Sequence, residues 1–171
     1  MCRRLPVLLL LALLILAAPA RAFNFAAVEP TPAPEISFLD EDGNARTLED
    51  FRGKVVVLNL WATWCAPCRR EMPSLDRLQA EHGGDDLLVL PLSQDRGEAQ
   101  EQIDAFFEEL GLENLAVFRD PKASAGRAFR APGLPTTIVI DREGREVGRV
   151  LGHAEWDSAE AVALVQAVMA E

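Results

Sequence analysis

The sequence predicts an α/β fold in which a central mixed β-sheet is flanked by helices on both faces. Apolar runs without alternation, at residues 54–61 and 86–92, are typical of strands that are covered on both faces. Stretches with apolar positions at helical spacing follow these runs, and a hairpin pattern comes late, over residues 136–151. This order is typical of a mixed sheet, and 171 residues suffice for one domain with a full core.

The first 22 residues have the pattern of a secretory signal. Arg3 and Arg4 form a positively charged start, residues 5–18 form an apolar stretch, and Ala20-Arg21-Ala22 is a small-residue cleavage site. An uncleaved N-terminal anchor is the alternative, although the apolar stretch is short for a bilayer span. Both interpretations predict a periplasmic or secreted protein, either soluble after cleavage or tethered by an N-terminal anchor.

Residues 23–35 are expected to be a linker, because they contain three prolines and show neither helical nor strand periodicity. Removal of residues 1–22 takes away three arginines and no acid, so the formal net charge falls from −10 to −13. Such a charge disfavours binding to nucleic acid or to an anionic membrane, and it favours neutral or basic protein partners.

The domain itself is predicted over residues 36–171, and local patterns delimit its elements. Thr47 is suited to cap one helical turn that ends at Gly53, and Gly111 is suited to end an amphipathic helix. Asp157 is suited to cap the last helix. We expect strands at 36–39, 54–61, 86–92, 115–118, 136–140 and 146–151, and helices from Ala66, over 97–110, over about ten residues after Pro121, and at the C-terminus.

Two cysteines, Cys65 and Cys68, stand between the apolar run at 54–61 and a helix that begins near Ala66. Two intervening residues allow the sulfurs to meet across one helical turn, and the helix N-terminus directs free N–H groups and a positive dipole end at the first sulfur. A thiolate is stabilised there, and thiolates perform disulfide exchange. Pro67 fits the first turn, where a missing N–H costs nothing. The pattern predicts a thiol–disulfide centre with Cys65 as nucleophile and Cys68 as the resolving thiol.

Two other roles for the cysteine pair are less well supported. A zinc site needs four ligands, and besides the pair only His82 and His153 remain after residues 1–22, which contain Cys2, are removed. An inert structural disulfide would close a very short loop, and the stabilisation by a disulfide rises with loop length. We therefore expect no metal site and no cofactor.

Glu71 and Asn59 are polar residues within apolar elements. At 100° per residue Glu71 falls within the stripe formed by Cys68, Met72 and Leu75, so its carboxyl is either partly buried or directed at the cysteines. Burial would raise its pKa and suit it to exchange a proton with the pair near neutral pH; the alternative is an ordinary, partly exposed helix glutamate. Asn59 is expected to be a hydrogen-bonded amide in the core.

A proline and two tryptophans are further candidates for support of the active site. Pro135 opens the apolar run at 136–140, a place that is compatible with a cis bond in a tight turn. Trp61 and Trp64 are expected to pack around the cysteine motif, with Trp64 the better candidate for a surface that contacts a partner.

Taken together, the motifs resemble the TlpA/ResA-like (DsbE/CcmG-like) thiol–disulfide oxidoreductases of the thioredoxin superfamily. The resemblance covers residues from about 35 to 170, and the motifs that carry it are Trp61-Ala62-Thr63-Trp64-Cys65-Ala66-Pro67-Cys68-Arg69-Arg70-Glu71-Met72-Pro73-Ser74-Leu75 and Gly133-Leu134-Pro135-Thr136-Thr137. One departure from thioredoxin itself stands out, because Asn59 occupies the place of the strand aspartate.

The resemblance implies a thioredoxin-like fold with an N-terminal extension and an insertion around residues 94–120. It implies a cis Pro135 beside the cysteine pair, with Leu134 before it, and an acid at Glu71 that tunes the pair. It also implies a reductant of disulfides in client proteins such as apocytochrome c or copper-site proteins, re-reduced by a membrane thiol donor of the DsbD/CcdA type. We expect a monomer.

Two other functions remain open at this point. The first is a copper chaperone that uses the cysteine pair as soft ligands, although the chain shows no nearby third ligand. The second is a peroxiredoxin-like peroxidase, which shares the superfamily. The cysteine motif here has the W-C-x-P-C pattern rather than the single-cysteine setting of that group.

Overall fold

The computed structural model describes residues 23–171, and the predicted signal segment lies outside the described residues. Eight strands form one mixed sheet in the order β1-β8-β7-β4-β5-β6-β2-β3. The strands are β1 (Phe25–Pro32), β2 (Ser37–Leu39), β3 (Ala45–Thr47), β4 (Val55–Trp61), β5 (Leu87–Ser93), β6 (Phe118–Arg119), β7 (Thr136–Ile140) and β8 (Arg145–Leu151). The helices are η1 (Leu48–Phe51), α1 (Ala66–His82), α2 (Gln100–Leu110), α3 (Ser124–Ala128) and α4 (Ala159–Met169).

Strand β4 lies at the centre of the sheet, with all seven of its residues buried. It pairs with β5 in parallel and with β7 in antiparallel orientation. Its side chains alternate between two apolar clusters, since Val55 and Val57 belong to one cluster and Val56, Leu58 and Leu60 to the other. The unbroken apolar run that predicted this strand is therefore explained by burial on both faces.

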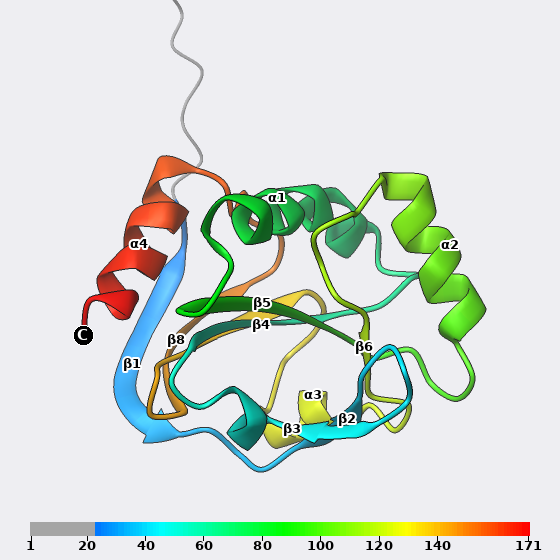
Figure 1. Ribbon diagram of the computed structural model, residues 1–171, viewed down its shortest axis with the longest axis horizontal. Helices are drawn as coiled ribbons and strands as arrows, with labels where there is room; N and C mark the ends of the chain where they lie inside the picture. Colours follow the sequence, from blue (N-terminus) through cyan, green and yellow to red (C-terminus); the bar gives the residue numbers. More distant parts are fainter. Residues whose placement is uncertain (1–22) are drawn as a thin grey trace, which may run out of the picture.

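The two clusters are covered by different helices, as the sequence predicted. Figure 1 shows α1, α2 and α4 on one side of the sheet and the short helices α3 and η1 on the other. Buried side chains from α1, α2 and α4 belong to the first cluster, whereas Ala125 of α3 belongs to the second. The result is a thioredoxin-like α/β fold, and no helix within residues 23–171 has the length and apolar character needed to cross a bilayer.

The segment around residues 94–120 carries α2 and returns to the sheet at β6. Helix α2 packs Phe106 against Trp61, with ring centroids 4.7 Å apart. Beyond the helix, the buried carboxylate of Asp76 on α1 accepts hydrogen bonds from Nδ2 of Asn114 (2.7 Å) and from the backbone N–H groups of Asn114 and Leu115 (2.8 and 3.1 Å). The insertion is thus fixed to the helix that carries the cysteines.

The predicted linker at residues 23–35 is wrong for most of its length, because Phe25–Pro32 form strand β1. This strand pairs with β8 as an edge strand, with a register shift between Ala27 and Thr31. An edge strand tolerates proline, since one row of its N–H groups faces away from the sheet. The strand was missed because the segment is rich in proline and because its mostly exposed side chains show no apolar alternation.

Two helix predictions also need correction. The helix after Pro121 has five residues rather than about ten, and it ends before Arg130, whose φ of 50° lies in the left-handed region. The cap of α4 is Ser158, whose side chain accepts from the Ala161 N–H, rather than Asp157. Asp157 instead accepts a hydrogen bond from Nε of Arg77 at 2.6 Å.

Candidate active site

The cysteine pair lies where β4 ends and α1 begins. Cys65 is the N-cap residue of α1 and Pro67 lies in its first turn. The two sulfurs form a disulfide, and the Cys68 N–H donates to Sγ of Cys65 at 3.3 Å. That N–H is one of the free donors of a helix N-terminus, so the same contact is available to a Cys65 thiolate.

The two sulfurs differ in accessibility. Cys65 is 5% exposed and Cys68 is fully buried, whereas Trp64, directly before the pair, is 73% exposed. An incoming disulfide therefore meets Trp64 and Cys65 first. Trp61 behaves differently from Trp64, because it is buried in the core beneath the site.

The loop before β7 lies beside the pair. The peptide bond between Leu134 and Pro135 is cis, which confirms the expected isomer. Thr136 pairs with Leu60, so Pro135 stands at the same end of the sheet as Trp61 and the cysteine motif that follows it. The carbonyl of Pro135 accepts from the N–H of Gly152, and Leu134 is half-buried.

Glu71 lies fully buried one turn after Cys68. Its Oε1 accepts from Nδ2 of Asn59 at 2.6 Å, and its Oε2 accepts from the Ala154 N–H at 3.1 Å. Asn59 also donates to Oγ1 of Thr137 at 2.8 Å, which confirms that it is a hydrogen-bonded amide in the core. Glu71 makes no hydrogen bond to either cysteine in the part of the chain described here.

The environment of Glu71 disfavours its charged form. Burial raises the pKa of Glu71 to about 8, although the hydrogen bonds from Ala154 and Asn59 act in the opposite direction. Neither donor is a cation, so within residues 23–171 the carboxylate has no counter-ion that could offset the loss of hydration. A carboxyl with this pKa exchanges a proton near neutral pH, one helical turn from the cysteines.

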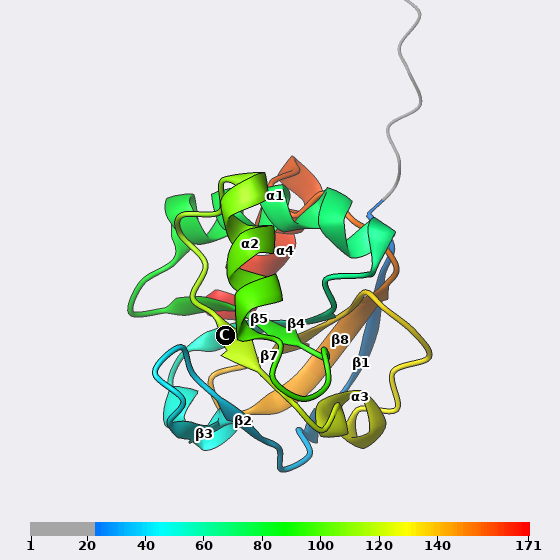
Figure 2. The same cartoon turned by 90° about the vertical axis from the view of Figure 1, so that its right-hand side faces the viewer.

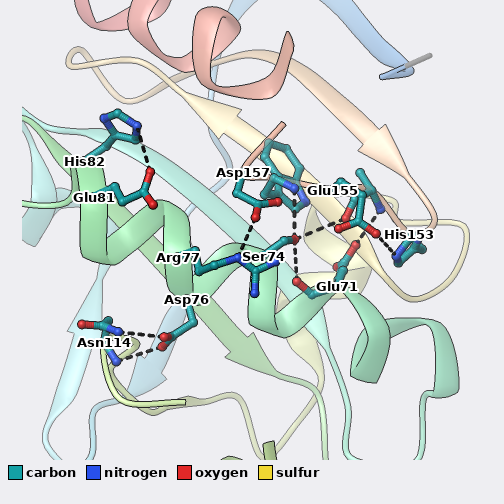
Figure 3. Close-up of polar contacts among 12 residues, drawn as sticks. Glu71, Ser74, Asp76, Arg77, Glu81, His82, Asn114, His153, Glu155 and Asp157 are labelled. Atoms are coloured by element: carbon teal, nitrogen blue, oxygen red, sulfur yellow. Dashed lines mark hydrogen bonds and ion pairs between the residues drawn. The ribbon is translucent and has the colours of Figure 1, made fainter. Parts of the chain in front are cut away.

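Helix α1 also holds the loop that follows β8, and the sequence reasoning missed this contact. Oγ of Ser74 accepts from the Trp156 N–H at 3.0 Å and donates to the carbonyl of Glu71 at 2.7 Å. Figure 3 shows Glu71, Ser74 and Arg77 directed from the helix toward this loop. Their spacing of three residues is the signal that identifies one helix face.

Asp95 is a second residue that sequence reasoning missed. Its carboxylate accepts from the backbone N–H and from Oγ1 of Thr63, both at 2.9 Å, and from Oγ of Ser93 at 2.9 Å. It thereby fixes the turn that leads into Trp64 and Cys65. The available signal was its place just after a buried strand, at the sheet edge where sites in α/β folds form.

Within residues 23–171, no three His, Cys, Asp or Glu side chains gather so as to hold a metal ion together. The arrangement does contain a disulfide-bonded cysteine pair of unequal accessibility, a helix N-terminus beside Sγ of Cys65 and a buried acid one turn after Cys68. Such a set of groups is suited to dithiol–disulfide exchange.

Comparison with known proteins agrees with this chemistry. Residues 30–145 match the model of the AhpC/TSA family. Over 117 residues the chain is 36% identical to the thioredoxin-like protein YneN of Bacillus subtilis, covering 68% of this chain and 67% of that one. Over 119 residues it is 34% identical to the thiol–disulfide oxidoreductase ResA of Geobacillus kaustophilus, covering 70% and 66%. The matched region thus spans about two thirds of each relative.

Solved structures show the same fold. A protein of Chlorobium tepidum assigned as the thiol:disulfide interchange protein DsbE superposes with a TM-score of 0.72. The superposition covers 84% of this chain and 99% of that one, at 26% sequence identity.

Proposed function

The chain belongs to the AhpC/TSA family, as a thiol–disulfide oxidoreductase of the ResA and DsbE type, and on this basis we propose that it reduces disulfides of client proteins outside the cytoplasm. The observation that carries the proposal is the unequal pair at the start of α1, in which Cys65 keeps a small exposed fraction of 5% and Cys68 is fully buried. The signal pattern of residues 1–22 supports a periplasmic or secreted location.

The proposed reaction starts from the reduced pair. The Cys65 thiolate attacks one sulfur of the client disulfide, a bond forms between Cys65 and that sulfur, and the other client sulfur leaves as a thiolate that takes up a proton. Cys68 then attacks Cys65, which forms the Cys65–Cys68 bond and releases the second client thiol. Two electrons and two protons pass to the client, and the protein leaves oxidised.

Glu71 has a proposed part in the second attack. Cys68 must lose its proton before it attacks, and Glu71 is a buried acid of suitable pKa in the following turn. Since no hydrogen bond joins Glu71 to Cys68, we assign its influence to charge. Above about pH 8 the carboxyl is ionised, and a carboxylate in an apolar surrounding raises the pKa of a nearby thiol.

The client and the electron donor follow from the family resemblance. We propose clients such as apocytochrome c or copper-site proteins, and a membrane thiol donor of the DsbD/CcdA type that returns the protein to its reduced state. A donor is required, because a pair in an oxidising compartment acts as a reductant only while it is kept reduced. No cofactor is needed, and we expect the protein to act as a monomer.

The proposal is tested by comparing the number of thiols that this protein loses with the number that the client gains. The reduced chain, freed of excess reductant, is mixed with a disulfide-bonded protein such as insulin, and thiols on both proteins are counted by alkylation and mass spectrometry. We expect two thiols to disappear from Cys65 and Cys68 for each client disulfide that opens. Cys65→Ser should abolish the transfer, and unchanged reduction by Cys65→Ser would contradict the proposed role.

A further inference from the structure

A groove opens directly beside the redox pair. It has a volume of about 490 Å³, and its lining includes Trp64, directly before Cys65, and Leu134, the residue before the cis proline. Its remaining wall comes mainly from α3 and from the segment that leads to β7. In Figure 2 this segment runs up from α3 on the same side as the amino-terminal end of α1. The size lies in the range of ligand-binding clefts, which is about 300–1,000 Å³.

The groove differs in charge from the rest of the chain. Of its eleven lining residues three are arginines, Arg96, Arg127 and Arg130, and none is acidic. The whole chain has 27 acidic and 17 basic residues. The groove is therefore lined by positive charge only, whereas the chain as a whole has an excess of acidic residues. It also lies where a client would approach Cys65.

These three arginines are also free of carboxylate partners within residues 23–171. Seven of the twelve arginines of that part of the chain pair with an Asp or Glu, and the five that do not include all three in the groove. Arg96 and Arg130 make no side-chain hydrogen bond there either, whereas Nη1 of Arg127 donates to the carbonyls of Lys122 and Ala123. All three are exposed. Their guanidinium groups therefore remain available to an external anion.

The backbone that presents two of these arginines is held in place. The Ala131 N–H donates to the carbonyl of Gly126 at 2.8 Å, and the Arg130 N–H donates to that of Arg127 at 3.1 Å. At the floor of the groove, Oε1 of Gln94 accepts from the Gly126 N–H at 3.1 Å. A fixed backbone lowers the entropy lost when a ligand binds.

We propose that this groove binds the client segment that flanks the disulfide, and that it selects segments with an Asp or Glu beside the reacting cysteine. The inference rests on the proposed function and names the chemistry of its partner. Guanidinium groups form paired hydrogen bonds with carboxylates, and the exposed indole of Trp64 supplies an apolar contact. The acidic surface elsewhere repels such a segment, so the groove also fixes the direction in which the client enters.

Disulfide-linked reporter peptides test the selection. Each peptide carries one cysteine in a disulfide with a quenched fluorophore, and the residues on either side of the cysteine are Glu, Gln or Lys. With the reduced wild-type chain at low ionic strength, we expect the Glu peptide to react about tenfold faster than the Gln peptide. The advantage should shrink as salt is added.

The variant Arg96→Gln/Arg130→Gln removes two groove cations whose side chains make no hydrogen bond or ion pair within residues 23–171. It should lower the rate for the Glu peptide about five- to tenfold and leave the rate for the Gln peptide unchanged. Arg46→Gln/Arg52→Gln removes the same charge from residues that do not line the groove, and it should keep the wild-type preference.

Two outcomes would overturn the groove assignment alone: equal rates for the Glu and Gln peptides with the wild-type chain, or an unchanged preference in Arg96→Gln/Arg130→Gln. An equal loss of preference in the Arg46→Gln/Arg52→Gln control would also contradict it, because the effect would then come from net charge. If the reduced wild-type chain opens no peptide and no protein disulfide, the proposed function itself fails.

Discussion

At the scale of single residues, the most informative feature is a carboxyl group in the core without a cation beside it. Glu71 receives one hydrogen bond from an amide and one from a backbone N–H, and both donors are neutral. Oδ1 of Asn59 is itself buried and has no hydrogen-bond partner in the described part of the chain. The fold thus keeps a buried acid whose only hydrogen-bond partners in residues 23–171 are neutral, and strongly perturbed acids of this kind cluster at functional sites.

The raised pKa of Glu71 predicts how stability depends on pH. The folded chain binds the Glu71 proton more tightly than the unfolded chain does, so this proton stabilises the fold below pH 4.5, and the stabilisation is lost as pH rises to about 8. The loss is at most about 5 kcal/mol. Glu71→Gln should remove this pH dependence of stability. In urea unfolding of the oxidised proteins, the free energy of unfolding of the variant should therefore rise relative to that of the wild type between pH 5 and pH 9. A constant difference across that interval would contradict the raised pKa.

The same substitution tests the link between Glu71 and the thiols. Without the carboxylate, the thiol of Cys68 should titrate at lower pH, because no buried negative charge opposes its ionisation. Thiolate absorbance of the reduced protein across pH 5–11 measures this. Glu81→Gln, on the same helix but exposed, serves as the matched control. An identical titration curve in Glu71→Gln would leave Glu71 with a structural role only.

At the scale of elements, helix α1 joins the cysteines to a distant loop. Glu71, Ser74 and Arg77 each contact the chain between β8 and α4, and Asp76 holds the end of the insertion from another side of the same helix. One helix therefore fixes two segments around the redox pair. The apolar stripe of α1 could be read from periodicity, but these polar contacts depend on segments far apart in the sequence.

Ser74→Ala should loosen the loop after β8. The substitution leaves the buried Trp156 N–H without its acceptor, which costs about 1–3 kcal/mol. Hydrogen exchange of the Trp156 amide should accelerate, and the free energy of unfolding in denaturant should fall. Glu81→Ala, on the exposed side of α1, should change neither. Unaltered exchange at Trp156 in Ser74→Ala would show that the hydroxyl is not the acceptor.

Elements with strong local signals were predicted, and elements defined by distant contacts were not. The strand at 136–140 was predicted with its observed bounds, and the predicted central strand differs from the observed one only by including Lys54. Strand β1 was missed because its pairing with β8, rather than its own side chains, makes it a strand. Helix α3 was predicted too long because its end depends on the left-handed Arg130, for which an arginine gives no sequence signal.

At the scale of the whole molecule, β1 closes one end of the eight-stranded sheet. Five of its residues pair with β8, and Phe23 just before it packs edge-on against Trp156, with ring centroids 5.1 Å apart. Without β1 the edge of β8 would be open, and open edges promote association between chains. The segment predicted as a linker is thus part of the folded domain.

A comparison of two chain lengths tests this role of β1. A chain that starts at residue 33 should be less stable by about 2 kcal/mol than one that starts at residue 23, because it lacks the strand pairing and the contact of Phe23. Thermal unfolding measures the difference, and light scattering follows association of the shorter chain. Equal melting temperatures would contradict an integral β1.

The proposed exchange reaction requires Cys65 to be the nucleophile and Cys68 to be the resolving thiol. The most direct measurement compares the reduced Cys68→Ser and Cys65→Ser chains after incubation with disulfide-bearing extracytoplasmic proteins, using non-reducing gels and mass spectrometry. We predict that Cys68→Ser accumulates mixed disulfides through Cys65, because the second attack is removed while the more accessible sulfur remains. Cys65→Ser should accumulate none, and equal trapping by both chains would contradict the account.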